Sequence, residues 1–228
     1  MEFPGLADRL GQVRTAIQER QRAAGLTQPV TIVAVTKGHG PEAVRAAHAV
    51  GLTVVGENRV QEALEKQERT AGLSIRWHLI GTLQKNKARH AAGRFALIHS
   101  VDRLDLAVEL DRRSGEGLRQ RILVQVNCSA EPQKGGVEPE ALPGLLDEIA
   151  RLPQLEVGGL MTMAALTDDV GEQRRTFTAL RMLRDAAVGR GHAGGELSMG
   201  MSGDYLVAVE EGATMVRLGT LLFGERNP

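Results

Sequence analysis

The 228-residue sequence predicts an α/β fold, a closed (β/α)8 or TIM barrel, in a single domain spanning residues 1–228. Eight short apolar runs recur along the chain, helical segments lie between them, and no low-complexity linker interrupts the series. Regular alternation of strand and helix implies parallel strands joined by right-handed crossovers. Eight such units in a chain of this length favour a closed barrel, with an open doubly wound sheet as the alternative.

The expected elements follow one another in a regular order. The chain opens with an amphipathic helix, whose apolar residues Ala7, Leu10, Val13 and Ile17 recur with helical spacing. The predicted strands occupy positions 30–36, 52–55, 76–80, 95–98, 122–126, 155–159, 196–199 and 214–218. Gly40 and Pro41 form a typical helix start, and Gly51 a typical helix end. The glycine-containing stretches 115–117 and 132–136 are expected to be loops.

Composition excludes several classes of protein. Lys and Arg together number 28, as do Asp and Glu, so no bulk positive field favours nucleic acid or anionic lipid as a partner. The single cysteine rules out an internal disulfide, and the six histidines show no HxxH or HxxxH spacing, so we expect no metal site. No apolar stretch approaches the ~18 residues of a membrane span, and the N-terminal residues do not resemble a secretory signal. We therefore expect a cytoplasmic protein without a membrane partner.

Lys37 is the most informative residue, because it directly follows the β-branched run at 30–36. A strand of this composition is typically buried on both faces of a parallel sheet, and its C-terminal end is where barrels place their ligands. Partial burial there would lower the pKa of the lysine and make a neutral, nucleophilic amine available near neutral pH. This is what Schiff-base formation with an aldehyde requires.

A phosphate site is predicted after the last two strands, where positions 197–204 read LSMGMSGD and positions 216–220 read VRLGT. Glycines let backbone N–H groups approach an anion, and the hydroxyls of Ser202 and Thr220 can donate two further hydrogen bonds. Barrel closure would bring these loops beside Lys37, so a phosphorylated aldehyde fits both features. The alternative is that the glycines only make turns.

Two further residues fit the same ligand. Arg217 lies on the last predicted strand, where a buried arginine needs a partner. One natural partner is the pyridine nitrogen of pyridoxal phosphate, which an arginine would keep unprotonated, weakening the ring as an electron sink. The alternative is a surface arginine, or one paired to Glu57 or Glu225. Asn58 can hydrogen-bond the phenolic oxygen of the cofactor, cap the following helix, or do both.

Taken together, these motifs resemble the pyridoxal phosphate homeostasis protein family, single-domain relatives of the N-terminal barrel of alanine racemase. The matching stretches occur in family order at positions 34–37, 56–62, 77–87, 158–163, 197–204 and 216–220. The resemblance implies pyridoxal 5'-phosphate (PLP) as the cofactor, bound as a Schiff base on Lys37 with its pyridine nitrogen near Arg217. It also implies that the phosphate is held by Ser202, Gly219 and Thr220.

Because this family is understood to bind and supply PLP, we expect a homeostasis protein that carries the cofactor, with apo-PLP enzymes as candidate acceptors. We assign no catalytic residue and no established turnover. The alternatives are a weak PLP-dependent amino-acid racemase or lyase, and a cofactor-free enzyme that uses Lys37 as an aldolase-type Schiff base on a sugar phosphate.

The racemase alternative lacks a second base and a second domain. Racemisation needs two bases on opposite faces of the substrate, and alanine racemases take the second from a tyrosine of the partner subunit. The only tyrosine here, Tyr205, directly follows the phosphate loop. The chain also ends soon after its eighth unit, without the β domain that alanine racemases carry, which leads us to expect a monomer.

Overall fold

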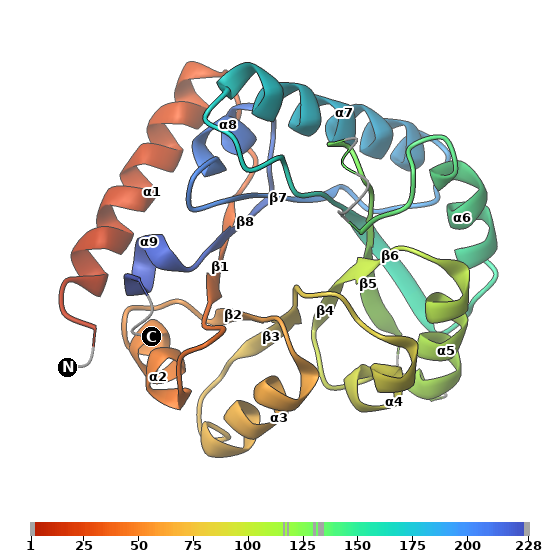
Figure 1. The fold of residues 1–228 in the computed structure, drawn as a ribbon, viewed down its shortest axis with the longest axis horizontal. Coiled ribbons are helices and arrows are strands. Elements are labelled where there is room, and N and C mark those ends of the chain that lie inside the picture. The colour runs from red at the N-terminus through yellow and green to blue at the C-terminus, as the bar shows by residue number, and fades with distance from the viewer. Residues whose placement is uncertain (1–2, 116, 118, 130, 132–134, 226–228) are drawn as a thin grey trace.

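Eight parallel strands close into a barrel in sequence order, as Figure 1 shows for the computed structural model, which describes residues 3–115, 117, 119–129, 131 and 135–225. The predicted barrel is thereby confirmed and the open sheet is excluded. The strands are β1 (Thr31–Val35), β2 (Val54–Glu57), β3 (Arg76–Leu79), β4 (Leu97–Val101), β5 (Gln120–Gln125), β6 (Leu155–Met161), β7 (Glu196–Met201) and β8 (Met215–Leu218).

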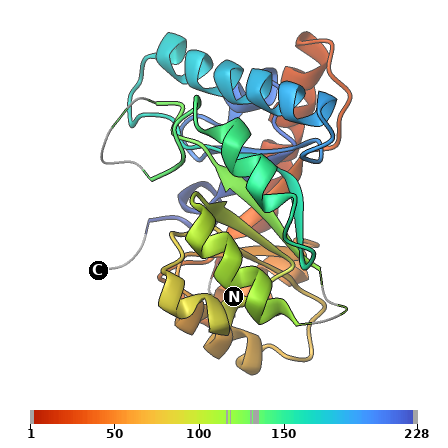
Figure 2. The same ribbon diagram turned by 90° about the vertical axis from the view of Figure 1, so that its right-hand side faces the viewer.

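Helices surround the ring of strands, as Figures 1 and 2 show in two perpendicular views. The helix α2 begins after Gly40 with Pro41 in its first turn, and Gly51 after its end has a left-handed φ of 80°, as predicted. The helical elements are α1 (Leu6–Ala23), α2 (Pro41–Ala49), α3 (Val60–Arg69), the 3-10 turn η1 (Lys85–Lys87), α4 (Ala88–Ala91), α5 (Leu104–Ser114), α6 (Leu142–Ile149), α7 (Val170–Gly189), α8 (Tyr205–Glu210) and α9 (Thr220–Phe223).

Closure is made by β1, which pairs with β2 on one side and with β8 on the other. In the closing pair, Val33 lies opposite Arg217 and Ala34 opposite Leu218. Because all the strands are parallel, their C-terminal ends share one rim of the barrel. Residues that follow β1, β2, β7 and β8 are therefore brought to the same end of the molecule.

Two hydrophobic clusters separate the barrel interior from its outer layer. Consecutive residues on β1 divide between them, because strand side chains alternate in direction: Val33 belongs to the inner cluster and Ala34 to the outer one. The outer cluster fills the space between strands and helices. The inner cluster consists of Val33, Val54, Leu97, Leu123, Met161 and Met215. Its side chains fill the interior, so the barrel is a packed core rather than a pore.

Several strands run further toward the rim than the apolar runs predicted. β2 continues to Glu57, β4 to Val101 and β7 to Met201. The predicted strand ends were wrong because polar residues beyond the apolar runs are also buried, where hydrogen bonds satisfy them. The Oγ of Ser100, for example, donates to the carbonyl oxygen of Gly81 at 2.7 Å. Part of each motif at these strand ends therefore belongs to a strand rather than to a loop.

Position 116 and positions 132–134, within the two stretches predicted to be loops, lie outside the described residues. In the part of the chain that the structure describes, no helix has the length and apolar character needed to cross a bilayer.

Gly81 allows the segments after β2 and β3 to approach each other closely. A Cβ atom at this position would lie 2.3 Å from the carbonyl oxygen of Asn58 and 2.8 Å from its Cα atom. Both atoms belong to the backbone, so neither can turn aside as a flexible side chain would. The absence of a side chain at Gly81 is thus a condition for the position of Asn58.

We expect Gly81→Ala to lower the free energy of unfolding by roughly 1–3 kcal/mol, because the added methyl group forces the two backbones apart. Equilibrium denaturation in urea measures this. Gly72→Ala is the matched control, since a Cβ atom at Gly72 meets nothing within 4 Å. Equal stabilities of the two variants would contradict the role given to Gly81.

Candidate functional site

The residues predicted to bind a ligand gather at the rim where the strands end. Lys37 lies two residues beyond β1 and is partly buried. Gly219 and Thr220 directly follow β8, and a Cβ atom at Gly219 would lie 3.4 Å from the carbonyl oxygen of Val35, the last residue of β1. Closure of the barrel therefore brings the start of α9 beside the end of β1, close to Lys37.

Ser202 belongs to the same corner of the rim. Its Oγ accepts a hydrogen bond from the backbone N–H of Leu221 at 3.3 Å, which places the hydroxyl beside the first turn of α9 and next to Thr220. Ser202 and Gly219 are partly buried, and Thr220 is exposed. The structure thus brings together all three residues of the predicted phosphate site, at a corner that solvent reaches.

Gly200 and Asp204 shape the turn that presents Ser202. Gly200 has a left-handed φ of 90°, and a Cβ atom there would lie 2.6 Å from the Cβ of Ala208. The buried Asp204 carboxylate accepts a hydrogen bond from the backbone N–H of Met201 at 2.5 Å. The interpretation of the glycines as turn-makers therefore holds at Gly200.

Arg217 is 4% exposed and points into the barrel, where neutral oxygens hold it. Its Nη1 donates to the Oγ of Ser198 at 2.7 Å and to the carbonyl oxygen of the same residue at 2.9 Å. Its Nη2 donates to the carbonyl oxygen of Thr162 at 2.9 Å. The alternatives of a surface arginine or a partner of Glu57 are wrong, because Arg217 is buried and Glu57 pairs with Lys66 instead.

The guanidinium of Arg217 is a buried positive charge without a bonded counter-ion. Among the described residues no carboxylate forms an ion pair with it. Burial lowers its pKa to about 10, and the charge of nearby Asp204 opposes that shift. Three hydrogen bonds leave two of the five guanidinium N–H groups for a ligand. This part of the barrel therefore favours an anion or an electron-rich acceptor.

Asn58 lies one residue after β2 and is partly buried, close to Gly81. It does not cap α3, because the N-cap of that helix is Arg59, which makes no side-chain capping bond. The capping interpretation is therefore wrong, and the interpretation of Asn58 as a ligand contact stays a prediction.

Three rings anchor the loop that follows Lys37. The imidazole of His39 contacts the ring of Phe3, with centroids 5.5 Å apart, and the ring of Phe223, with centroids 5.7 Å apart. The two phenylalanines also meet edge to face, at 5.3 Å. The segment before α1, the loop after Lys37 and the end of α9 are thus packed against one another.

A buried ion pair behind Lys37 was missed by sequence reasoning. Glu57 is fully buried, and its Oε1 accepts hydrogen bonds from the Nζ of Lys66 at 2.6 Å and from the hydroxyl of Thr36. Lys66 also donates to the carbonyl oxygen of Thr36 at 2.8 Å. Burial raises the pKa of Glu57, whereas both bonds oppose the rise. The pair ties the ends of β1 and β2 to α3, directly before Lys37.

Two buried histidines were also missed. The Nδ1 of His78 on β3 lies 3.0 Å from the Nε2 of His99 on β4, and the Nδ1 of His99 lies 2.9 Å from the Oγ of Ser198. Burial lowers the pKa of His78 to about 3 and that of His99 well below its ordinary value, so both rings are neutral. A search for HxxH spacing does not find them because the pair forms across two strands. Within the described ranges, no group of three or more His, Cys, Asp or Glu side chains could hold a metal ion.

Tyr205 lies at the start of α8 and is partly buried. Burial raises the pKa of its phenol, and the positive charge of Arg20 on α1 opposes that rise. The phenol is therefore within the electrostatic influence of the outer helix α1.

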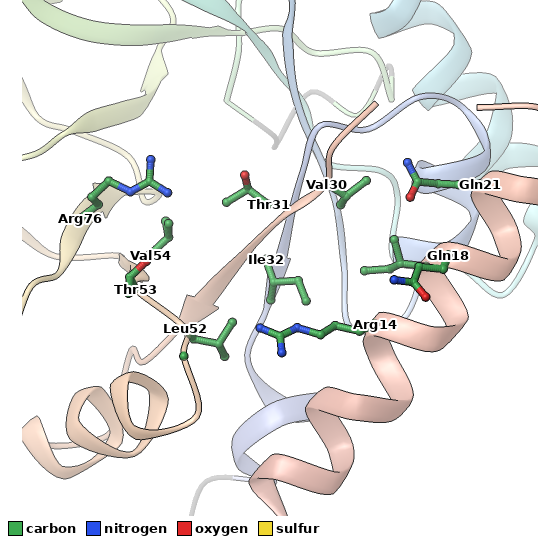
Figure 3. A pocket seen from close by; sticks show the side chains of 12 residues that line it. Arg14, Gln18, Gln21, Val30, Thr31, Ile32, Leu52, Thr53, Val54 and Arg76 are labelled. Atoms are coloured by element: carbon green, nitrogen blue, oxygen red, sulfur yellow. The ribbon is translucent and has the colours of Figure 1, made fainter. Parts of the chain in front are cut away.

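A cavity of about 370 Å³ opens at the other end of the barrel, where β1, β2 and β3 begin (Figure 3). Side chains of α1 form one wall, among them Arg14 and Gln18, and Arg76 lies across from them. None of the predicted site residues lines this cavity. In barrels of this kind the N-terminal end generally contributes to stability rather than to ligand binding.

Comparison with known proteins finds matches along nearly the whole chain. A family model described as alanine racemase, N-terminal domain, matches residues 9–227. The pyridoxal phosphate homeostasis protein of Aquifex aeolicus (strain VF5) is 43% identical over 222 residues, which cover 96% of this chain and 97% of the relative.

Solved structures of related proteins share the fold of this chain. PipY of Synechococcus elongatus PCC7942, with PLP bound, superposes with a TM-score of 0.84 at 38% sequence identity, covering 96% of this chain and all of PipY. Alanine racemase from Corynebacterium glutamicum is 21% identical with a TM-score of 0.74, and the match covers 61% of its chain. The second likeness concerns the fold alone.

The two neutral histidines should make the protein sensitive to acid. Below about pH 6.5 the unfolded chain protonates both rings while the folded protein does not, so each should lower the free energy of unfolding by about 2 kcal/mol between pH 7.5 and pH 5. In His99→Asn the contribution of His99 is absent. The decrease in the free energy of unfolding between pH 7.5 and pH 5 should therefore be about 2 kcal/mol smaller than in the wild type. Urea denaturation at both pH values measures it. An unchanged loss in His99→Asn would contradict the neutral state of His99.

Proposed function

The chain belongs to the pyridoxal phosphate homeostasis protein family, and on that premise we propose that it binds PLP and maintains the intracellular supply of this cofactor. The observation that carries the proposal is the buried guanidinium of Arg217, which has no bonded counter-ion among the residues that the structure describes and lies at the end of the barrel where Lys37 and the predicted phosphate corner lie. PLP is an anion with an acceptor nitrogen, and it complements that charge.

The residues at the rim fit the four polar parts of PLP. Lys37 would meet the aldehyde, and Arg217 the pyridine nitrogen through its remaining N–H groups. The phosphate would accept hydrogen bonds at the corner formed by Ser202, Gly219 and Thr220, whose hydroxyl and backbone positions are brought together by the bond between Ser202 and Leu221. Asn58, whose backbone lies against Gly81, would hydrogen-bond the phenolic oxygen.

Attachment to Lys37 would be covalent and reversible. In its neutral form the Nζ would attack the aldehyde carbon, a C=N bond would replace the C=O bond, and the carbonyl oxygen would leave as water with the two amine protons. Hydrolysis runs the same step backward and returns PLP, so a carrier needs no other reagent. The ion pair of Glu57 and Lys66 supports this role because it holds Thr36, the residue before Lys37, on both its hydroxyl and its carbonyl group.

A weak racemase or lyase is the second candidate. Bound PLP supplies an electron sink, and the sink is deepest when the pyridine nitrogen is protonated. Arg217 donates hydrogen bonds and does not readily give up a proton, which favours holding the cofactor over using it. Tyr205, the only tyrosine, is within the electrostatic influence of α1, which argues against it as the second base.

The finer features of the proposal are a monomeric carrier in the cytoplasm that passes PLP to apo-PLP enzymes. A barrel that completes the corner from its own chain needs no second subunit to bind the cofactor. Release by hydrolysis would let the acceptor take PLP either from solution or in a transient complex.

The experiment that tests the proposal is reduction of the PLP-treated protein with borohydride, followed by peptide mapping. We expect the pyridoxyl label on Lys37, because Lys37 is the lysine beside the phosphate corner. Lys85→Ala should be labelled like the wild type and Lys37→Ala should not. A label found mainly on Lys85 or Lys87 would refute the assignment. Absence of a visible absorption band with PLP would favour the cofactor-free enzyme.

Proton exchange at the α-carbon separates the carrier from the enzyme. With L-alanine or L-serine in deuterium oxide, we expect negligible incorporation of deuterium and no D-enantiomer, because the ring nitrogen stays unprotonated and only Lys37 is suited to proton transfer. Mass spectrometry and chiral chromatography measure the two events separately. Efficient exchange with inversion that is lost in Lys37→Ala would establish an enzyme.

A further inference from the structure

A continuous chain of hydrogen bonds crosses the interior of the barrel behind Arg217. It runs from Arg217 on β8 to Ser198 on β7, then across the interior to His99 on β4, and ends at His78 on β3. The three steps measure 2.7, 2.9 and 3.0 Å, and every member is buried. None of its three inner members belongs to the predicted ligand contacts.

The direction of this chain follows from the chemistry of its members. An arginine only donates hydrogen bonds, so the Oγ of Ser198 must accept from Arg217. All three contacts of the chain are hydrogen bonds when the Ser198 hydroxyl donates to the Nδ1 of His99 and the Nε2 of His99 donates to the Nδ1 of His78. Both rings are neutral, so a single tautomer of each suffices. The donors then all point from Arg217 toward β3.

We propose that Ser198 and His99 are positioning residues, which hold the Arg217 guanidinium in the orientation in which it meets the ring of the bound cofactor. Two oxygens of Ser198 accept hydrogen bonds from Nη1, and the carbonyl oxygen of Thr162 accepts one from Nη2. The carbonyl oxygen of Ser198 is fixed by β7, and Thr162, directly after β6, is fixed by hydrogen bonds from its N–H to Ser198 and from its hydroxyl to Val126. The Ser198 hydroxyl is fixed only if something holds its rotamer, and His99 does so from across the barrel.

The neutrality of the chain matters as much as its geometry. A carboxylate in the place of the Ser198 hydroxyl would also hold the guanidinium but would cancel its charge. The Ser198 hydroxyl, itself held by a neutral imidazole, satisfies an N–H group of Arg217 and leaves the positive charge for the ligand. The chain therefore orients Arg217 without weakening its attraction for an anionic cofactor. This inference rests on the proposed binding of PLP.

The test uses the full-length protein with PLP in Ser198→Ala, His99→Phe and His99→Asn, with Ser114→Ala as the control. Ser114 is also buried and loses one hydrogen bond, to the carbonyl oxygen of Leu110, far from the rim. Two quantities are measured: the dissociation constant of PLP, and the absorption spectrum of the bound cofactor from about pH 6 to pH 9.

We expect Ser198→Ala and His99→Phe to weaken PLP binding by about three- to thirtyfold, because each loosens a hydrogen-bond partner of a charged group. Their bound spectra should change with pH where the wild-type spectrum does not, since a misplaced Arg217 lets the ring nitrogen take up a proton. His99→Asn keeps an acceptor for Ser198 and should stay close to wild type, as should Ser114→Ala. The double variant Ser198→Ala, His99→Phe should bind PLP no more weakly than whichever single variant binds it more weakly.

The outcomes that overturn the inference are distinct from failure of the proposed function. Wild-type affinity and spectra in folded Ser198→Ala and His99→Phe refute it, as does an additive loss in the double variant. If Ser198→Ala does not fold, the difference between His99→Phe and His99→Asn decides in the same way. A wild-type protein that takes up no PLP refutes the proposed function, and the inference with it.

Discussion

The site depends on one costly feature, a guanidinium buried in the barrel to which no carboxylate of the described residues is bonded. Removing such a charge from water costs on the order of several kcal/mol, and hydrogen bonds to neutral oxygens recover only part of that. Arg217 can be tolerated there because three oxygens hold it and because strands on all sides keep it in place. An anionic ligand would recover the part of this desolvation cost that the hydrogen bonds do not, so the buried charge would contribute to affinity for a ligand rather than to stability.

Glu57 and Lys66 form an instructive contrast with Arg217. Both side chains are buried, but the Nζ of Lys66 lies 2.6 Å from the Oε1 of Glu57, so their charges compensate each other. They sit between the strands and α3, on the outer side of the barrel, where no ligand is expected. The inward arginine has no such partner among the described residues and the outward pair is complete, so the fold separates the charge proposed to bind a ligand from the charges that hold the rim together.

Much of the fold could be predicted from sequence because its signals are local. Apolar runs and helix signals such as Pro41 are read within a few residues, and eight strands in series nearly dictate closure. Strand ends were missed where a polar residue finds its partner far along the chain, as Ser100 finds Gly81. The proximity of Lys37 and Gly219 was predictable because it follows from closure alone.

The surroundings of Arg217 could not be predicted in the same way. Its partner Ser198 lies on β7 and its partner Thr162 directly follows β6, and their polar atoms meet it only through register and side-chain direction. The two histidines likewise stand far apart in sequence and carry no spacing signal. The one signal in the sequence for this contact is side-chain alternation, which places Arg217 and Ser198 on the inward side of two neighbouring strands.

The contact of Phe3, His39 and Phe223 joins the first described residues, the loop of Lys37 and the last helix. During synthesis on a ribosome, Lys37 emerges early, whereas β8 and α9 appear only when nearly the whole chain has been made. Until then Lys37 lacks the neighbours that β8 and α9 supply when the barrel closes. On the proposed function, nascent and truncated chains would therefore be poor competitors for the cofactor, and occupancy of this site would report the number of finished molecules.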